Sequence, residues 1–341
     1  MLTQKQNEEI IEHLEKAQNP LFYFDNDPDG LCSFLLLQRW LGRGKGVAGK
    51  SDLGKSYFRK VGELNADYIF ILDKPLVDKE FFEEARKINI PVVWIDHHEI
   101  PKEDIPDFVH YFNPFFNTPS SNEPVTALCY DATKKKDDLW IAVTGCISDG
   151  FVPPFYSEFE KKYPDLTTIK KKAFDILYGS ELGKIARILG LALKDRTTNV
   201  VNMLKFLMKV KTPYEVLEET SLNRAMHERF NEIEKKINHL VLGVEEDGEN
   251  LLFFRYGGDL SISSEVANDL WYRFPKKFVI VAYVKGWKTN LSLRGKNVKE
   301  KFLQVLPKIK GLKGGGHDNA VGGQMNSEDL DKFREEFEKV L

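Results

Sequence analysis

The sequence is poor in cysteine, in long apolar runs and in net charge. Only 3 of its 341 residues are cysteines, and none forms a Cys-x-x-Cys pair. This argues against a disulfide framework and predicts buried thiols in a reducing compartment. No apolar run approaches the roughly 20 residues that span a bilayer, and the polar N-terminus does not resemble a signal peptide. We therefore expect a cytoplasmic protein without a membrane partner.

The net charge of −3 does not by itself indicate a nucleic-acid-binding protein. One segment, residues 285–313, is nevertheless strongly basic and contains Glu300 as its single acid. Its basic residues are Lys285, Lys288, Arg294, Lys296, Lys299, Lys301, Lys308, Lys310 and Lys313. Two interpretations stay open: a surface that attracts anions, or a solvated lysine-rich face.

Apolar runs and helical patterns alternate through the first third of the chain. A capping box at Thr3–Gln6 predicts an N-terminal helix, and residues 31–37 open a largely buried helix. The continuous apolar runs read as buried strands at 21–24, 68–72 and 92–95. The alternation continues to about Asn113. It predicts an α/β fold with a mainly parallel sheet and helices on both faces.

The pattern changes after Asp149. Helical patterns fill residues 151–240, notably at 184–189, 200–207 and 229–233, and a break is expected at 151–155. Strands are predicted again at 251–256, 278–283 and 289–294, with a helix at 263–271, a glycine-rich turn near 314–316 and a final helix from about Ser327. We therefore expect three parts: residues 1–152, a helical connector at 153–240, and a smaller α/β domain at 241–341.

Acidic and histidine clusters follow the apolar runs. They are Asp25-Asn26-Asp27-Pro28-Asp29-Gly30, then Asp73, then Asp96-His97-His98, and later Asp149. Ligand sites of open α/β sheets lie outside the carboxyl ends of the strands, so the clusters are expected to meet at one edge. Crowded carboxylates repel one another, and a pair of divalent cations would offset that repulsion. Mixed oxygen and imidazole ligands suit Mn²⁺ best, with Mg²⁺ or Co²⁺ as substitutes.

These motifs resemble those of the DHH-family phosphoesterases that carry a C-terminal DHHA1 domain. The D-x-D-x-D-G motif corresponds to residues 25–30, the lone strand-end aspartate to Asp73, and the Asp-His-His triplet to residues 96–98. Asn113-Pro114 and Asp149 match two further motifs, in family order. The G-G-G-H signature corresponds to residues 314–317, with Ala320 and Gly322-Gly323 beyond it.

The resemblance implies a role for each matched residue. The catalytic set would be Asp25, Asp27, Asp73, His97, His98 and Asp149. All of these except His98 would bind two Mn²⁺ ions, with Asp73 as the bridging ligand. Asp29 and Asp96 would hold the metal-binding residues in position without binding the metal. The substrate would contact His98, Arg294, Gly315, Gly316 and His317. For Asp29 and Asp73 the alternative is a cap on the helix that follows each of them.

The implied function is metal-dependent hydrolysis of phosphodiesters. Many family members that act on small substrates carry a histidine just before the first aspartate pair, and residues 21–24 contain none. This favours a RecJ-like nuclease that acts on the end of single-stranded DNA, RNA or short oligonucleotides, and Trp287 within the basic segment adds a stacking surface. The alternatives are a phosphodiesterase or phosphatase for cyclic dinucleotides or phosphoadenosine phosphate, and a replication scaffold. Replication or repair proteins and a second copy of the chain are candidate partners.

Overall fold

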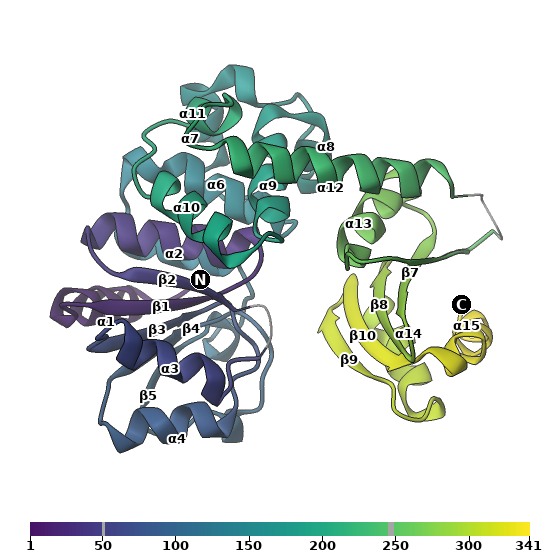
Figure 1. Ribbon diagram of the computed structural model, residues 1–341, viewed down its shortest axis with the longest axis horizontal. Coiled ribbons are helices and arrows are strands. Elements are labelled where there is room, and N and C mark those ends of the chain that lie inside the picture. The colour runs from purple at the N-terminus through teal and green to yellow at the C-terminus, as the bar shows by residue number, and fades with distance from the viewer. Residues whose placement is uncertain (50–51, 245–248) are drawn as a thin grey trace. The chain divides into compact units, whose positions relative to one another are not determined.

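The computed structural model describes residues 1–49, 52–244 and 249–341. They form two compact units, Met1–Asn231 and Glu232–Leu341, and the boundary falls inside helix α12 (Arg224–Leu242). Figure 1 labels the elements of both units, which are described separately below. The division at residues 152 and 240 stays a prediction from sequence.

The first unit is built on a five-stranded sheet in which every neighbouring pair is parallel. Its order is β2-β1-β3-β4-β5. The strands are β1 (Pro20–Asp25), β2 (Lys45–Gly49), β3 (Tyr68–Leu72), β4 (Val92–Ile95) and β5 (Val109–Phe112). The strands predicted at 21–24, 68–72 and 92–95 are confirmed. Strand β2 was not predicted from the sequence, because Val47 and Ala48 are its only apolar residues apart from glycine.

Helices cover both faces of this sheet, as the sequence predicts (Figure 1). Phe34 of α2 (Pro28–Leu41) stacks on Phe24 of β1, with ring centroids 5.1 Å apart. Leu21 and Tyr23 point the opposite way, into a core completed by α3 (Lys55–Glu63) and α4 (Lys79–Lys87). Alternate residues of a strand face opposite sides, so burial on both faces requires the continuous apolar runs seen in the sequence.

Three further helices complete the α2 side: α1 (Gln4–Lys16), α5 (Val125–Thr133) and α6 (Leu139–Ser148). Helix α6 approaches its neighbours closely because Gly145 has no side chain. A Cβ at this position would lie 2.8 Å from the Cβ of Cys32 and would collide with Thr126 of α5. All three cysteines are buried here as free thiols, which confirms that part of the prediction.

The segment between the two sheets is helical, as predicted. Its helices are α7 (Tyr156–Lys162), α8 (Ala173–Gly179), α9 (Glu181–Ala192), α10 (Thr197–Leu207), α11 (Tyr214–Leu217) and α12. Helices α7, α8 and α9 pack against α6 and therefore belong to the first unit. Among the helices of the described residues, none is both long and apolar enough to cross a membrane.

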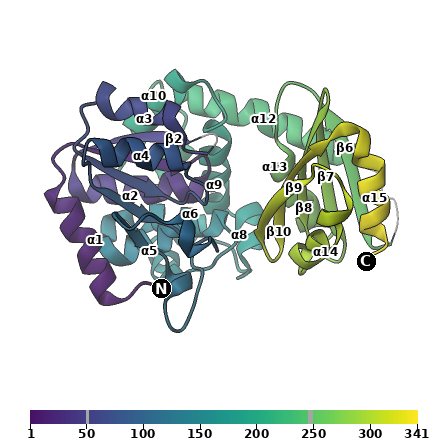
Figure 2. The same cartoon turned by 90° about the horizontal axis from the view of Figure 1, so that it is seen from below.

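The second unit contains a mixed five-stranded sheet with the order β6-β7-β8-β10-β9. Strands β6 and β7 are parallel, and the other pairs are antiparallel. Its elements are β6 (Leu251–Gly257), α13 (Ser263–Arg273), β7 (Phe278–Lys285), β8 (Lys288–Arg294), α14 (Val298–Val305), β9 (Lys313–His317), β10 (Ala320–Asn326) and α15 (Leu330–Glu338). Helices α14 and α15 bury one face of the sheet, and α13 contacts β7 and β8 (Figure 2).

The predicted glycine-rich turn is wrong, because residues 314–316 lie within edge strand β9. The turn itself is Asp318–Asn319. Gly316 has φ 149°, and a Cβ there would meet the carbonyl oxygen of Ala320 in β10. Glycine is therefore required at Gly316 for the close pairing of β9 with β10. The final helix begins close to its predicted position, after a short 3-10 turn at Ser327–Asp329.

Candidate metal centre and substrate surface

The polar clusters of the first unit lie together at the carboxyl edge of its sheet. Asp25 ends β1, Asp73 follows β3, and Asp96 follows β4. The backbone N–H of Asp73 donates to Ile95 at 3.0 Å and that of Asp96 to Phe112 at 3.0 Å, so the strand ladder continues into both aspartates. The fold therefore holds these residues through their backbones before any ligand is present.

Asp73 is the most constrained carboxylate of the cluster. It is 3% exposed and has φ 58°, a left-handed conformation that costs free energy outside glycine. Its Oδ1 accepts no hydrogen bond within the described residues, although Nε2 of His97 lies 3.4 Å away. Burial raises the pKa of Asp73 well above its ordinary value, and the neighbouring carboxylates, Asp29 foremost, raise it further.

The two histidines are oriented by different partners. Nδ1 of His97 lies 3.1 Å from the carbonyl oxygen of Asn122, whereas Nδ1 of His98 lies 2.8 Å from Oδ1 of the fully buried Asp96. The side-chain amide of Asn113 donates to the backbone carbonyl of His98 at 2.8 Å. Each ring is thus held through its Nδ1, so a metal ion or a substrate would meet Nε2.

The environment also favours a charged His97. Burial lowers the pKa of His97, but the negative charges of Asp149, Asp29 and Asp96 outweigh this effect, so its pKa is raised overall.

Asp27 caps the helix that Asp29 was expected to cap, and Asp29 caps a different helix. Asp27 caps α2, because its Oδ1 accepts from the backbone N–H of Gly30 at 2.9 Å. The alternative that Asp29 caps the helix following it is therefore wrong. Both oxygens of Asp29 instead accept from the first turn of α5, at 2.9 Å from Val125 and 2.8 Å from Thr126. Sequence spacing could not reveal this contact, because α5 lies almost a hundred residues further along the chain.

Asp149 follows the last residue of α6 at the rim of the cluster. The residue is exposed on one side, yet the protein around its carboxyl raises the pKa to about 6 by desolvation, partly offset by His97. The pKa of Asp27 is also raised well above its ordinary value, by burial first and by Asp25 next. Within the described first unit, two sets of three donors converge within 4.8 Å: Asp29, His97 and Asp149, and Asp73, Asp96 and His98.

These residues fit a divalent cation. Asp73 Oδ1 and Asp96 Oδ2 are buried without a hydrogen-bond partner in the described chain. The pKa values of three carboxyl groups, Asp27, Asp73 and Asp149, are raised with burial as the leading cause. A bound cation would satisfy the bare oxygens and favour the ionised carboxylates. Mixed carboxylate and imidazole donors suit a transition-metal ion such as Mn²⁺.

Lys74 was given no role from the sequence, yet it lies inside this cluster. It is 5% exposed, and its Nζ donates to Oδ1 of Asp25 at 2.6 Å and to the carbonyl oxygen of Gly49 at 3.3 Å. The only sequence signal was a basic residue directly after the strand-end Asp73.

The second unit holds the predicted substrate residues at one end of β8, β9 and β10. Nε of Arg294 donates to the side-chain oxygen of Asn268 in α13 at 2.5 Å, and Nη1 donates to Leu293 at 2.8 Å. These contacts orient the guanidinium. Ala320 stands opposite Arg294 on one side and opposite His317 on the other.

A polar sheet face extends from these residues. The alternation of side chains places Arg294, Asn290 and Lys288 of β8 on the face opposite α14. The same register adds Gly322 and Gln324 from β10, and Gly315 and Lys313 from β9. A Cβ at Gly315 or Gly322 would meet no atom within 4 Å, so both backbones are open to a ligand. We call these residues, with Ala320 and His317, the open sheet face.

Trp287 lies at the far end of the open sheet face, in the turn between β7 and β8. It is 70% exposed, and Nζ of Lys288 lies 4.6 Å from its ring centroid. Other lysines of the basic segment are engaged elsewhere: Lys308 pairs with Glu336 of α15 at 3.0 Å, and Lys301 donates to the carbonyl oxygen of Val340 at 2.5 Å. The basic segment is therefore only partly available to a ligand.

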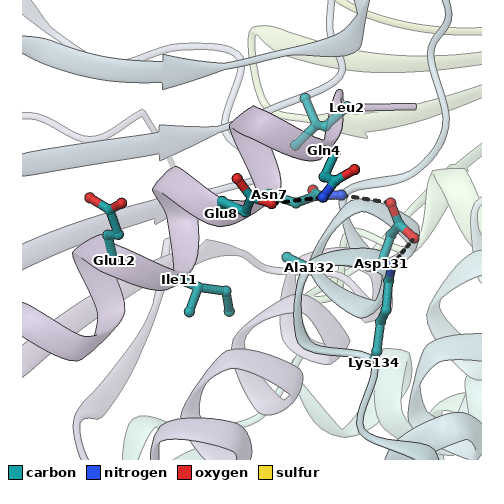
Figure 3. Close-up of a pocket in the computed structure, with 9 residues that line it drawn as sticks. All are labelled: Leu2, Gln4, Asn7, Glu8, Ile11, Glu12, Asp131, Ala132 and Lys134. Atoms are coloured by element: carbon teal, nitrogen blue, oxygen red, sulfur yellow. Dashed lines mark hydrogen bonds and ion pairs between the residues drawn. The ribbon is translucent and has the colours of Figure 1, made fainter.

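A separate groove of about 650 Å³ lies on the first unit between α1 and the end of α5 (Figure 3). Asn7 donates to Asp131 across it at 2.7 Å. Its lining residues are Leu2, Gln4, Asn7, Glu8, Ile11, Glu12, Asp131, Ala132 and Lys134. None of them belongs to the polar clusters at the sheet edge.

The fold and the carboxylate-histidine cluster together define a metal-dependent phosphoesterase. Residues 21–146 match the family model described as the DHH family, N-terminal domain, and residues 248–341 match the DHHA1 domain. The chain belongs to the DHH family and carries a DHHA1 domain. No curated protein sequence matches it.

Solved structures share its fold at low sequence identity. RecJ of Thermus thermophilus, determined with Mn²⁺, has a TM-score of 0.67 and 14% identity over 98% of this chain and 54% of its own. Exonuclease RecJ bound to manganese has a TM-score of 0.62 and 16% identity over 99% and 94%. CDC45 from Entamoeba histolytica has a TM-score of 0.53 and 12% identity, covering 98% of both chains. This chain therefore spans about half of the Thermus protein, and the likeness concerns the fold.

Proposed function

We propose that this chain hydrolyses phosphodiester bonds of single-stranded nucleic acid, from an end, with divalent cations held at the carboxylate cluster. The observation that carries the proposal is Asp73, whose buried and unpartnered Oδ1 lies 3.4 Å from Nε2 of His97. A bound cation at such a site lowers the pKa of a water molecule and offsets the charge that develops on phosphoryl oxygens. Manganese is the proposed ion because imidazoles accompany the carboxylates.

The chain's own residues would divide the remaining work. Asp73, His97, Asp27 and Asp149 would hold the cation. The contact of 2.8 Å between Asp96 and Nδ1 of His98 directs the other ring nitrogen of His98 to the substrate, where it can bind or protonate a phosphate oxygen. Because the side chain of His98 is 24% exposed and that of His97 is 3% exposed, His98 is the better placed of the two to meet a substrate.

The open sheet face supports a strand as the substrate. Arg294 can fork onto a phosphate, and bare backbone at Gly315 allows close approach. On this face Ser292 of β8 is buried and hydrogen-bonded to Ser263 of α13 at 2.9 Å, so the room for a strand lies along the exposed residues of β9 and at Gly322 of β10. The exposed ring of Trp287 adds a stacking surface for a base at the far end.

End-labelled DNA and RNA oligomers, and cyclic dinucleotides, incubated with Mn²⁺ test this proposal. We expect ladders from single-stranded oligomers, faster than turnover of cyclic dinucleotides, and none from the Asp73→Asn variant. If cyclic dinucleotides are cleaved faster than the oligomers, the substrate is a small nucleotide and not single-stranded nucleic acid. A purified protein that binds no cation and cleaves no substrate would instead support a scaffold, and then replication proteins become the partners to examine.

A further inference from the structure

Lys74 is a buried cation in the middle of the carboxylate cluster. Its side chain is 6% exposed, and its ammonium lies 2.6 Å from Oδ1 of Asp25. The carbonyl oxygen of Gly49 accepts a second hydrogen bond from it at 3.3 Å. An ammonium is retained in such a place only when it is paired, because leaving water is otherwise very costly. Asp25 and Lys74 therefore form an ion pair within the site, in which the ammonium is buried and the carboxylate side chain is 33% exposed.

The backbone around Lys74 holds this arrangement in place. The buried indole N–H of Trp94 in β4 donates to the carbonyl oxygen of Lys74 at 3.0 Å. The preceding residue, Asp73, has the left-handed φ of 58°, which turns the chain at the end of β3. Lys74 is thus fixed at both its backbone and its ammonium.

Asp25 carries an ion pair with an ammonium, at 2.6 Å. Like Asp27, it belongs to neither of the two sets of three converging donors in the described first unit. No histidine precedes it at positions 21–24 to supply an imidazole. The nearest positive charge to its carboxylate is therefore an ammonium supplied by the chain.

A divalent cation at Asp25 would have to share one carboxylate with that ammonium. Like charges repel at short range, and the ammonium of Lys74 is buried where it contacts Asp25. Asp73 Oδ1 instead faces the imidazoles of His97 at 3.4 Å and His98 at 3.9 Å, and an imidazole, unlike an ammonium, can give up its proton and bind a cation. The cluster therefore offers one good cation position rather than two equivalent ones.

We propose that the ammonium of Lys74 takes the place of one divalent cation beside Asp25, so that the centre binds a single cation, at Asp73 and His97. This rests on the proposed function for the nature of the cation, and it differs from the two Mn²⁺ ions that the sequence motifs imply. Lys74 thereby sets the metal stoichiometry of the centre.

Metal stoichiometry tests the proposal without any substrate. Isothermal titration with Mn²⁺ and elemental analysis should give one ion per wild-type chain and two per chain for Lys74→Met. The exposed Lys79 at the start of α4 provides the control, and Lys79→Met should still bind one. Electron paramagnetic resonance should show an isolated Mn²⁺ in the wild type and a spin-coupled pair in Lys74→Met. Two ions in the wild type, or one in Lys74→Met, would overturn the proposal.

A second variant keeps the proposal testable if Lys74→Met does not fold. Lys74→Gln keeps a hydrogen-bond donor beside Asp25 but removes the positive charge, so it should also bind two Mn²⁺ per chain. One ion in Lys74→Gln would contradict the assignment. If the wild type binds one ion as expected but cleaves no nucleic acid, the proposed function fails and the stoichiometry stands.

Discussion

Replacing Asp73 by asparagine should stabilise the metal-free protein and remove its response to Mn²⁺. Asparagine has nearly the same shape and tolerates the left-handed φ of 58°, so the fold should persist. The wild-type carboxylate is buried among other acids with one oxygen unpartnered, and its raised pKa shows that ionisation is unfavourable there. An unsatisfied buried acceptor costs more when it is charged than when it is neutral, so removing the charge should stabilise the variant by on the order of 1–3 kcal/mol at pH 8.

For a cooperative unit of 231 residues, this gain corresponds to a rise in Tm of about 2–12 °C. Scanning calorimetry in chelator should show the rise for Asp73→Asn and a much smaller change for Asp137→Asn, which alters an exposed aspartate. When the Mn²⁺ concentration is about a hundredfold the Kd of the wild type, the free energy of unfolding should rise by about 2.7 kcal/mol for the wild type and hardly at all for the variant. A metal-free variant less stable than wild type would refute the reasoning, because the carboxylate would then contribute favourable interactions of its own.

Three further predictions concern pH and the second unit. A carboxyl whose folded pKa is raised stabilises the fold at low pH and loses that contribution as pH rises. The unfolding free energy of the metal-free wild type, relative to Asp149→Asn, should therefore fall between about pH 4 and 6 in denaturant titrations, and a flat difference would contradict the pKa of about 6. Arg294→Ala should weaken oligomer binding by roughly tenfold to over a hundredfold, or about 1.5–3 kcal/mol. Elemental analysis should show an unchanged metal content. An unchanged KM with a lower Tm would show that Arg294 stabilises the fold and does not hold substrate. Trp287→Ala should cost about 1–3 kcal/mol for a long oligomer and little for a dinucleotide in fluorescence anisotropy, with Leu222→Ala as an exposed apolar control; equal losses on both ligands would exclude stacking.

The carboxylate cluster follows from sequence because it depends on one general property of parallel sheets. Continuous apolar runs mark strands buried on both faces, and residues directly after them must meet at the carboxyl edge. This reasoning located Asp25, Asp73 and Asp96 correctly at the ends of β1, β3 and β4. It needs only local patterns and the rule that the strands share one sheet.

Contacts between distant segments could not be predicted in the same way. The cap formed by Asp29 depends on where α5 lies, and the burial of Lys74 depends on Gly49 and on Trp94 in a neighbouring strand. The glycine run was mistaken for a turn because glycine serves tight turns and close strand pairing equally well. Only the register of β9 with β10 distinguishes these uses at Gly316.

The most direct test of a cation site at Asp73 is an anomalous difference map at the manganese edge, from crystals grown with Mn²⁺. The account predicts a peak within bonding distance of Asp73 Oδ1 and His97 Nε2, and none beside Asp25, where Lys74 stands. A map without a peak at Asp73, in crystals that contain Mn²⁺ elsewhere, would contradict the account.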